Sequence, residues 1–130
     1  MEFLHPPGWP RARGYSNGVA ARGRTLHISG MFGWDADGQF ASADFVAQSA
    51  QALRNIVAVL AEGGATPGHI VRMTWYVVDR AEYLGASRAL GLAYREVIGH
   101  HYPAMTAVQV AGLMDERARV EIEVTAMVDD

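Results

Sequence analysis

The most regular hydrophobic pattern in the chain lies between residues 45 and 60. Apolar side chains recur there with the 3.6-residue period of an α-helix, over about five turns. The periodic positions are Phe45, Val46, Ala50, Leu53, Ile56, Val57 and Leu60. Ser42 or Asp44 can cap the first turn. Gly63-Gly64 ends the pattern, so this segment predicts an amphipathic helix.

Two strands are predicted before this helix. The first covers residues 15–19 and the second residues 25–30, where Leu26 and Ile28 share one face. Residues 21–24 between them have the composition of a hairpin turn. The two strands are therefore expected to pair with each other.

After the helix, residues 70–78 alternate with apolar side chains on both faces, which favours a central strand. Asp79 and Glu82 have capping-box spacing, with Asp in place of Ser or Thr, and open a second predicted helix that Gly99 closes. The chain then ends in two further predicted strands, at residues 102–110 and 118–127. We expect these last two strands to form a pair and to carry any reaction centre.

The order β-β-α-β-α-β-β predicts an α+β fold, a single mixed β-sheet with two helices packed on one face. Residues 1–14 hold three of the five prolines, so we expect an extended N-terminal lead-in that Trp9 pins to the body. Met73 or Trp75 would lie on a sheet face that no third layer covers. A second subunit is the expected cover. At this length, residues 1–130 are expected to form a single domain.

Composition argues against several classes of function. The net charge is −3, the pI is near 5.9 and no Lys/Arg cluster occurs, so we expect no nucleic-acid or anionic-membrane partner. The absence of cysteine excludes disulfides, thiolate metal sites and Cys nucleophiles. No apolar run approaches the roughly 18–20 residues that span a bilayer, and the first residues do not resemble a signal peptide. We therefore expect a cytoplasmic protein.

The histidines, serines and glycines contain no familiar cofactor or hydrolase motif. The five histidines lack metal-ligand spacing, and His100 and His101 would point to opposite faces of a strand. No serine lies in a Gly-x-Ser-x-Gly elbow, and the glycines form no phosphate-binding loop. We expect neither a metal nor a cofactor.

Three charged residues each leave two interpretations open. Glu121 and Glu123 share one face of the last predicted strand, where both can be solvated or one can line a pocket and transfer protons. Arg88 lies between Leu84 and Leu92 on the second predicted helix. Its stem can cover the apolar stripe while its guanidinium reaches water, or the guanidinium can enter a site and bind an oxyanion.

Six short segments in this order carry a family resemblance over nearly the whole chain. They are Gly14–Val19, Ile28–Gly30, Gln51–Ile56, Ile70–Thr74, Tyr102–Ala104 and Val120–Glu123. Together they resemble the RidA/YjgF family of reactive-intermediate deaminases. The resemblance implies a chorismate-mutase-like fold and a homotrimeric barrel with pockets between subunits. It also implies cofactor-independent hydrolysis of small-molecule enamines and imines, such as 2-aminoacrylate, to a keto acid and ammonia.

The resemblance further implies which residues form the site. The family combines a tyrosine, the backbone of a Ser-Gly pair, an arginine after Pro-Ala, a cysteine two residues later and a glutamate on the final strand. The residues that match are Tyr15, Ser29, Gly30 and Glu121. By this resemblance Glu121 and the Ser29-Gly30 backbone are catalytic, and Tyr15 covers the substrate. Met105 stands in the arginine's position and Ala107 in the cysteine's.

Met105 is the departure with the larger consequence. Arginine forms a bidentate pair with a carboxylate, worth roughly 1.5–3 kcal/mol or more, and methionine cannot. The expected substrate is therefore larger or less anionic than 2-aminoacrylate. Phe32 and Trp34 would shape the pocket mouth, and Arg88 could supply the missing charge from another direction. Ala107 is compatible with a mechanism that uses no thiolate.

The same two departures also fit an alternative function. In that alternative, the chain forms a non-catalytic trimer that binds small metabolites or a partner protein in its intersubunit clefts. A ribonuclease activity, sometimes associated with the family, does not fit a net charge of −3 and the lack of a basic face.

Overall fold

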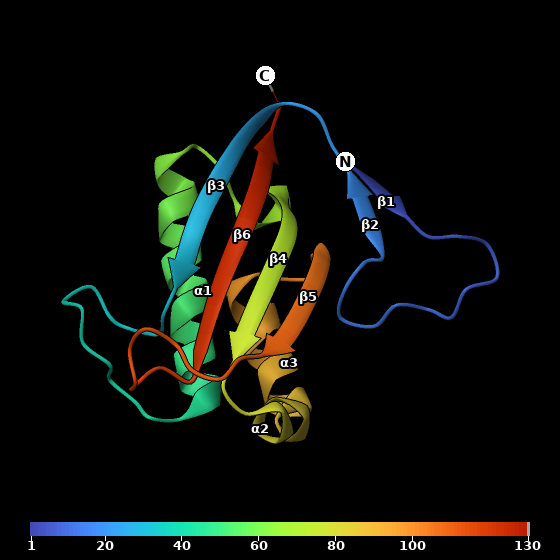
Figure 1. Cartoon of the computed structure of the whole chain (residues 1–130). Helices are drawn as coiled ribbons and strands as arrows, with labels where there is room; N and C mark the ends of the chain where they lie inside the picture. Colours follow the sequence, from blue (N-terminus) through green and yellow to red (C-terminus); the bar gives the residue numbers. More distant parts are fainter. Residues whose placement is uncertain (130) are drawn as a thin grey trace.

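A computed structural model of the chain describes residues 1–129 and shows one main β-sheet with all helices on one side (Figure 1). Four strands form this sheet in the order β3-β6-β4-β5. Their bounds are β3 Arg24–Met31, β6 Val120–Val128, β4 Ile70–Val77 and β5 Ala104–Gln109. β6 runs antiparallel to β3 and β4, whereas β5 runs parallel to β4. The predicted mixed α+β architecture with one main sheet is confirmed.

The helices are α1 (Phe45–Glu62), α2 (Arg80–Gly85) and α3 (Ser87–Val97), with a 3₁₀ turn η1 (Pro67–His69) before β4. The side chain of Asp44 caps α1, because it accepts a hydrogen bond of 2.9 Å from the Ala47 N–H. Gly63 follows the last residue of α1, as predicted. Gly99, with φ of 93°, lies in the left-handed region that favours glycine and ends the second helical segment. No helix among residues 1–129 is long and apolar enough to cross a membrane.

The prediction of one continuous second helix is wrong, because α2 ends at Gly85 and α3 begins at Ser87. Between them Ala86 leaves the helical conformation, with φ of −98° and ψ of 9°. Its N–H donates to the carbonyls of Glu82 and Tyr83 at 3.1 and 3.3 Å, which closes α2. Glycine is a weak helix former, so Gly85 marks a point where the helix breaks easily. The structure therefore has three helices where two were expected.

The N-terminal region also differs from the prediction. β1 (Glu2–Leu4) pairs antiparallel with β2 (Gly18–Ala20) in a separate two-stranded sheet, so the chain has two sheets and the predicted hairpin with residues 25–30 does not form. The three prolines lie between residues 6 and 10, after β1, and therefore leave its donors free to pair. The loop between β1 and β2 swings away from the main sheet (Figure 1), and Trp9 on it is 57% exposed rather than pinned.

The last two strands are not neighbours, because β4 lies between β5 and β6. The chain reaches β5 through α2 and α3, and a helical crossover of this kind places the next strand parallel to the one before it. The position of β4 inside the sheet confirms the predicted central strand. β5 is an edge strand, so the two predicted site strands are separated by the width of one strand.

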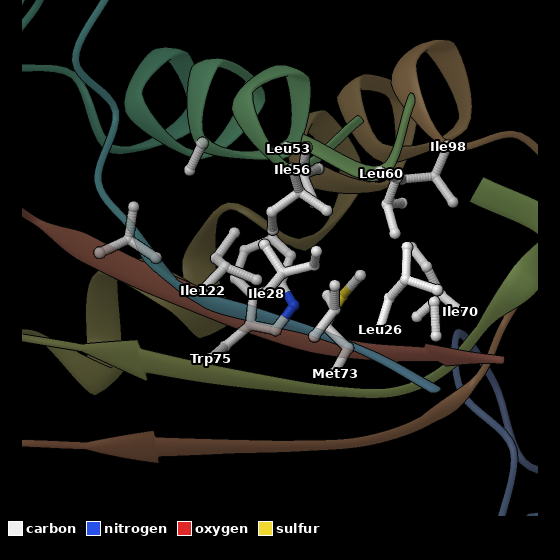
Figure 2. Close-up of a cluster of buried hydrophobic side chains, with 14 of the residues drawn as sticks. Leu26, Ile28, Leu53, Ile56, Leu60, Ile70, Met73, Trp75, Ile98 and Ile122 are labelled. Atoms are coloured by element: carbon white, nitrogen blue, oxygen red, sulfur yellow. The ribbon is translucent and has the colours of Figure 1, made fainter. Parts of the chain in front are cut away.

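The core lies between the sheet and the helices (Figure 2). Leu53, Ile56 and Leu60 of α1 are fully buried over the sheet, where Met73 and Trp75 are each 1% exposed. The expectation that Met73 or Trp75 would need a second subunit as cover is therefore wrong. The opposite face of the main sheet, which we call the open face, is mostly polar. Its side chains include His27, Ser29, Arg72, Thr74, Tyr76, Thr106, Glu121, Glu123 and Thr125.

One buried polar side chain links α1 to the loop before β6. Gln48 is 1% exposed, and its amide donates to the carbonyls of Ser42 and Arg117, each at 3.0 Å. Its side-chain oxygen accepts a hydrogen bond of 2.7 Å from the Arg119 N–H. All three of these partners are backbone groups, so Gln48 fixes the start of β6 against the helix layer.

Replacing Gln48 by leucine is expected to destabilise the fold by about 2–4 kcal/mol, because three partly buried backbone groups lose their partner. Chemical denaturation followed by circular dichroism measures the change. Gln51→Leu is the matched control on the same helix, since Gln51 bonds only side chains on the helix surface. The control is expected to lose less than about 1 kcal/mol. Equal losses in both variants would contradict the role assigned to Gln48.

Candidate functional site

A cavity of about 500 Å³ opens between β4, β5, α3 and the N-terminal loop. Its apolar lining comes mainly from Met73, Trp75, Leu90, Pro103 and Met105. Four of the chain's five tyrosines also line it, namely Tyr15, Tyr83, Tyr94 and Tyr102. Arg13 and Arg95 are the charged residues of the lining. A cavity of this size, mostly apolar with a few polar groups, has the character of a small-molecule site.

The tyrosines give this cavity a rigid aromatic wall. The rings of Tyr94 and Tyr102 stack with centroids 5.6 Å apart, and the Tyr94 hydroxyl donates to the His101 carbonyl at 2.6 Å. Burial raises the pKa of Tyr94 well above its usual value, and the neighbouring Tyr102 raises it further. Burial also raises the pKa of Tyr83. Both hydroxyls therefore stay protonated at neutral pH and can act only as neutral hydrogen-bonding groups.

Met105 lies on the floor of the cavity. It pairs with Met73 across β5 and β4, is half-buried and packs against the hydrophobic core. Ala107 pairs with Trp75 and points to the same helix-covered side. Both positions where the sequence departs from the family pattern are thus apolar, and of the two Met105 lines the cavity. A flexible thioether there can adapt to different ligand shapes.

Ser29 and Gly30 form a bulge on the other side of the molecule. Ile28 pairs with Val124 and Met31 with Ile122, so two residues of β3 oppose the single Glu123 of β6. A Cβ atom at Gly30 would lie 2.7 Å from the carboxyl carbon of Glu121. No side chain larger than hydrogen fits there without moving that carboxyl. The bulge and its glycine therefore fix where the Glu121 side chain can lie.

The carboxyl of Glu121 has unusual electrostatics for a half-exposed group. Burial raises the pKa of Glu121, and the charge of Glu123 two residues later raises it further. The Tyr76 hydroxyl donates to Glu123 Oε1 at 2.5 Å, and this hydrogen bond is the main cause of a raised pKa for Tyr76. Glu123 is thus held by Tyr76, whereas the raised pKa of Glu121 makes its carboxyl the candidate for proton transfer.

The predicted site residues fall into two groups on opposite faces of the sheet. Tyr15 and Met105 line the cavity on the helix side, and Ala107 faces the same side. Glu121 pairs with Tyr76, and its side chain lies on the open face with the Ser29-Gly30 bulge. Residues on opposite faces of one pleated sheet cannot meet at one substrate. Within a single chain, the predicted residues do not form one site.

Arg88, Phe32 and Trp34 lie outside the cavity. Arg88 is exposed on α3 and is absent from the lining. Phe32 and Trp34 pack edge to face at 5.2 Å, and the Asn55 amide donates to both of their carbonyls, at 3.0 and 2.8 Å. These two aromatics thus fasten the segment after β3 to α1. In this chain, none of the three shapes the pocket that contains Met105.

The sequence did not single out Arg13, Arg95 or three of the cavity tyrosines. The helix breaks at Ala86, so the residues of α3 do not face the directions that they would face in one continuous helix beginning at Asp79. The residues of α3 that point into the cavity could therefore not be deduced from the sequence. The sequence held one signal for Arg95, since it follows Gly91 by one helical turn and the two residues are therefore neighbours on the helix surface. Among residues 1–129, no group of three or more His, Asp or Glu side chains could hold a metal ion.

Comparison with known proteins gives consistent matches. The family model described as Endoribonuclease L-PSP matches residues 9–128. The human 2-iminobutanoate/2-iminopropanoate deaminase is 31% identical over 80% of this chain and 73% of its own length. Protein DfrA of Myxococcus xanthus is 30% identical over 95% of this chain and 93% of its own length.

Solved structures show the same fold. YyfB from Yersinia pestis, described as a protein of unknown function of the conserved Rid family, superposes with a TM-score of 0.88 at 31% identity, covering 98% of both chains. E. coli TdcF with bound serine superposes with a TM-score of 0.70 at 26% identity, covering 99% of this chain and 100% of its own. The arrangement of strands and helices described above is therefore shared across these proteins.

The raised pKa of Glu121 predicts how stability depends on pH. Because the folded-state pKa lies above the ordinary value of 4.5, the folded protein binds more protons than the unfolded chain over the window between the two values. Stability is full below that window and falls as pH rises through it. Glu121→Gln removes this loss, so the variant should gain stability relative to the wild type on going from pH 4 to pH 8.

Urea denaturation of both proteins across that range is the measurement. Thr106→Ala, at an exposed position of the same open face, is the control. It removes no titratable group and should differ from the wild type by the same amount at every pH. A stability difference for Glu121→Gln that does not change with pH would show that the carboxyl is not perturbed by its surroundings.

Proposed function

This chain belongs to the RidA/YjgF family, and on that premise we propose that it hydrolyses enamine and imine intermediates to a carbonyl compound and ammonia without a cofactor. The proposal rests on one observation above the others. The Glu121 carboxyl, with its raised pKa, lies against the Ser29-Gly30 bulge on an accessible sheet face. The related human protein is named as a deaminase of two small imino acids, which gives the same reaction class.

The chemistry uses a carboxyl whose pKa is raised above its ordinary value, which acts first as an acid and then as a base. In its protonated form, Glu121 gives a proton to the enamine carbon, which converts the enamine to an iminium ion. The resulting carboxylate takes a proton from water as the water oxygen attacks the iminium carbon. Glu121 then returns this proton to the nitrogen, and the carbon–nitrogen bond breaks as ammonia leaves. The hydroxyl proton passes back to the Glu121 carboxylate, which forms the carbonyl product and restores the acid. Backbone groups at Ser29-Gly30 would orient the reacting atoms.

We propose a homotrimer in which neighbouring subunits complete each site. Tyr15 and Met105 lie on one face of the sheet and Glu121 on the other, so one chain cannot supply both halves. In a cyclic assembly, each subunit presents two different surfaces to its two neighbours. The cavity of one chain can then meet the Glu121 face of the next. Phe32, Trp34 and Arg88 would reach substrate only if the assembly brings them to a neighbour's cavity.

The substrate proposed for this site is larger than 2-aminoacrylate. The cavity of about 500 Å³ is far bigger than a three-carbon enamine requires, and its lining is mostly apolar and aromatic. Met105 cannot form the charge-assisted pair that would hold a small carboxylate at the reacting end. An enamine or imine derived from a larger, cyclic or aromatic amine fits this lining better.

The same two departures from the family pattern also support a second function. Both Met105 and Ala107 leave the family pattern, so the chain can instead be a trimer that binds small metabolites without converting them. Under this alternative, imines and enamines over a broad size range would bind without turnover. Glu121→Ala would then weaken binding rather than remove an activity.

The substitution Met105→Arg is expected to raise the hydrolysis of 2-aminoacrylate by about 10- to 100-fold, since it restores a charge-assisted pair worth roughly 1.5–3 kcal/mol. The assay couples the protein to an enzyme that releases 2-aminoacrylate and follows the keto acid formed. Ala107→Cys, two residues along the same strand face, is the matched control and should change the rate little. High wild-type activity on 2-aminoacrylate would contradict the role assigned to Met105.

Mixing two inactive variants tests whether the site is shared. Glu121→Gln removes the proposed acid, and Gly91→Phe fills the cavity, since Gly91 is part of its lining. Each variant alone should be inactive. Random co-assembly in cyclic trimers leaves about one site in four with both wild-type halves, so about a quarter of the activity should return.

The activity is measured on the best imine substrate of a panel, after co-expression of the two variants. Sedimentation of the wild type is the accompanying measurement and should give a trimer. No recovery of activity from trimers that contain both variants would place the whole site within one chain. A stable monomer with full activity would do the same.

A further inference from the structure

We propose that Arg95 and Arg13 form an anion-binding position in the cavity and replace, from the helix side, the charge that Met105 lacks on the strand side. The inference rests on the proposed function and narrows its substrate. The preferred compound would carry an apolar or aromatic body and a carboxylate placed away from Met105. Such a compound contacts the tyrosine-lined wall with its body and the two guanidinium groups with its anion.

The Arg95 side chain occupies the space beside Gly91, a residue of α3 that has no side chain. A Cβ atom at Gly91 would lie 3.2 Å from Arg95 Nη1 and 3.8 Å from Nη2. The guanidinium therefore lies back along the helix over Gly91, where the missing side chain leaves room for it. Both residues belong to the cavity lining. Arg95 is an exposed residue, and its charged group lies beside Gly91 at the wall of the cavity.

The second arginine comes from a distant part of the chain. Arg13 lies on the loop between β1 and β2 and lines the same cavity beside Tyr15. Two exposed arginines from separate parts of the chain therefore line the same cavity. Guanidinium groups bind carboxylates and phosphates in a planar, bidentate manner, so a pair of them favours an anionic ligand.

Neither arginine forms an ion pair with any of the residues 1–129. The ion pairs among residues 1–129 join Arg117 to Asp115 and Arg119 to Glu82. No Asp or Glu is among the described residues that line the cavity. The protein has a net charge of −3, but the described lining of this cavity carries two positive charges and no negative one. A bound anion would balance it.

Arg88 is the residue that the sequence put forward for this charge, and the structure gives the role to another arginine of the same helix. Arg88 and Arg95 are both exposed on α3, but only Arg95 lines the cavity. Arg95 contacts the cavity from α3, while Met105 contacts it from β5. A substrate held by Arg95 would therefore be anchored by a group remote from its reacting end.

The test compares two ligands that differ only in charge, 3-phenylpropanoate and 3-phenylpropanamide. Isothermal titration of the full-length protein is expected to give about fivefold tighter binding of the carboxylate, the size typical of an exposed charge pair. In the double variant Arg13→Gln/Arg95→Gln, this preference should disappear while affinity for the amide stays within about twofold. Added salt should reduce the preference in the wild type only.

Arg80→Gln is the matched control, because Arg80 is exposed on the neighbouring helix and outside the lining, and it should keep the full preference. Equal affinities in the wild type, a preference that survives the double variant, or no binding of either ligand would overturn the inference. Its failure is distinguishable from failure of the proposed activity. If the carboxylate is preferred but no imine is hydrolysed, only the proposed deaminase activity is contradicted. If imines are hydrolysed but the carboxylate is not preferred, only the anion-binding position is contradicted.

Discussion

The pleat of the central strand β4 divides this molecule into two chemical environments. Met73 and Trp75 point into the helix layer, whereas Thr74 and Tyr76 point to the open face. Since neighbouring strands keep the same alternation, every residue of β5 and β6 is assigned to one side by its register with β4. The separation of Met105 from Glu121 is a direct result. A one-residue slip of β5 would exchange Met105 for Thr106 and remove the cavity floor.

A glycine at a β-bulge gives the open face its chemistry. Regular pairing would place a side chain from β3 beside Glu121, but the bulge puts Gly30 there instead. The carboxyl can then pack against the backbone, where burial and Glu123 raise its pKa. Bulges often re-aim groups next to active sites, and here the bulge falls on the Ser-Gly pair of the family pattern. The backbone of these two residues thus sets the surroundings of the carboxyl that we propose as the acid.

Local patterns predicted much of this fold, and longer-range pairing explains most errors. The 3.6-residue period and the cap at Asp44 predicted α1, and alternation predicted β4. The partner of β3 could not be deduced, because pairing with β6 depends on contacts about a hundred residues apart. The open face was misjudged because strand alternation does not say which face the helices cover. The family resemblance supplied the site residues, yet only the register showed that they lie on opposite faces.

Under the proposed function, the sheet separates substrate recognition from the reaction. A change of residue at Met105 on β5 does not touch the Glu121 face, because the two side chains lie on opposite sides of the sheet. Recognition can then move to α3 and the N-terminal loop, which are not part of the main sheet. The break at Ala86 and the absence of a side chain at Gly91 give Arg95 its place there. Such a division lets charge recognition shift while the bulge and its carboxyl stay unchanged.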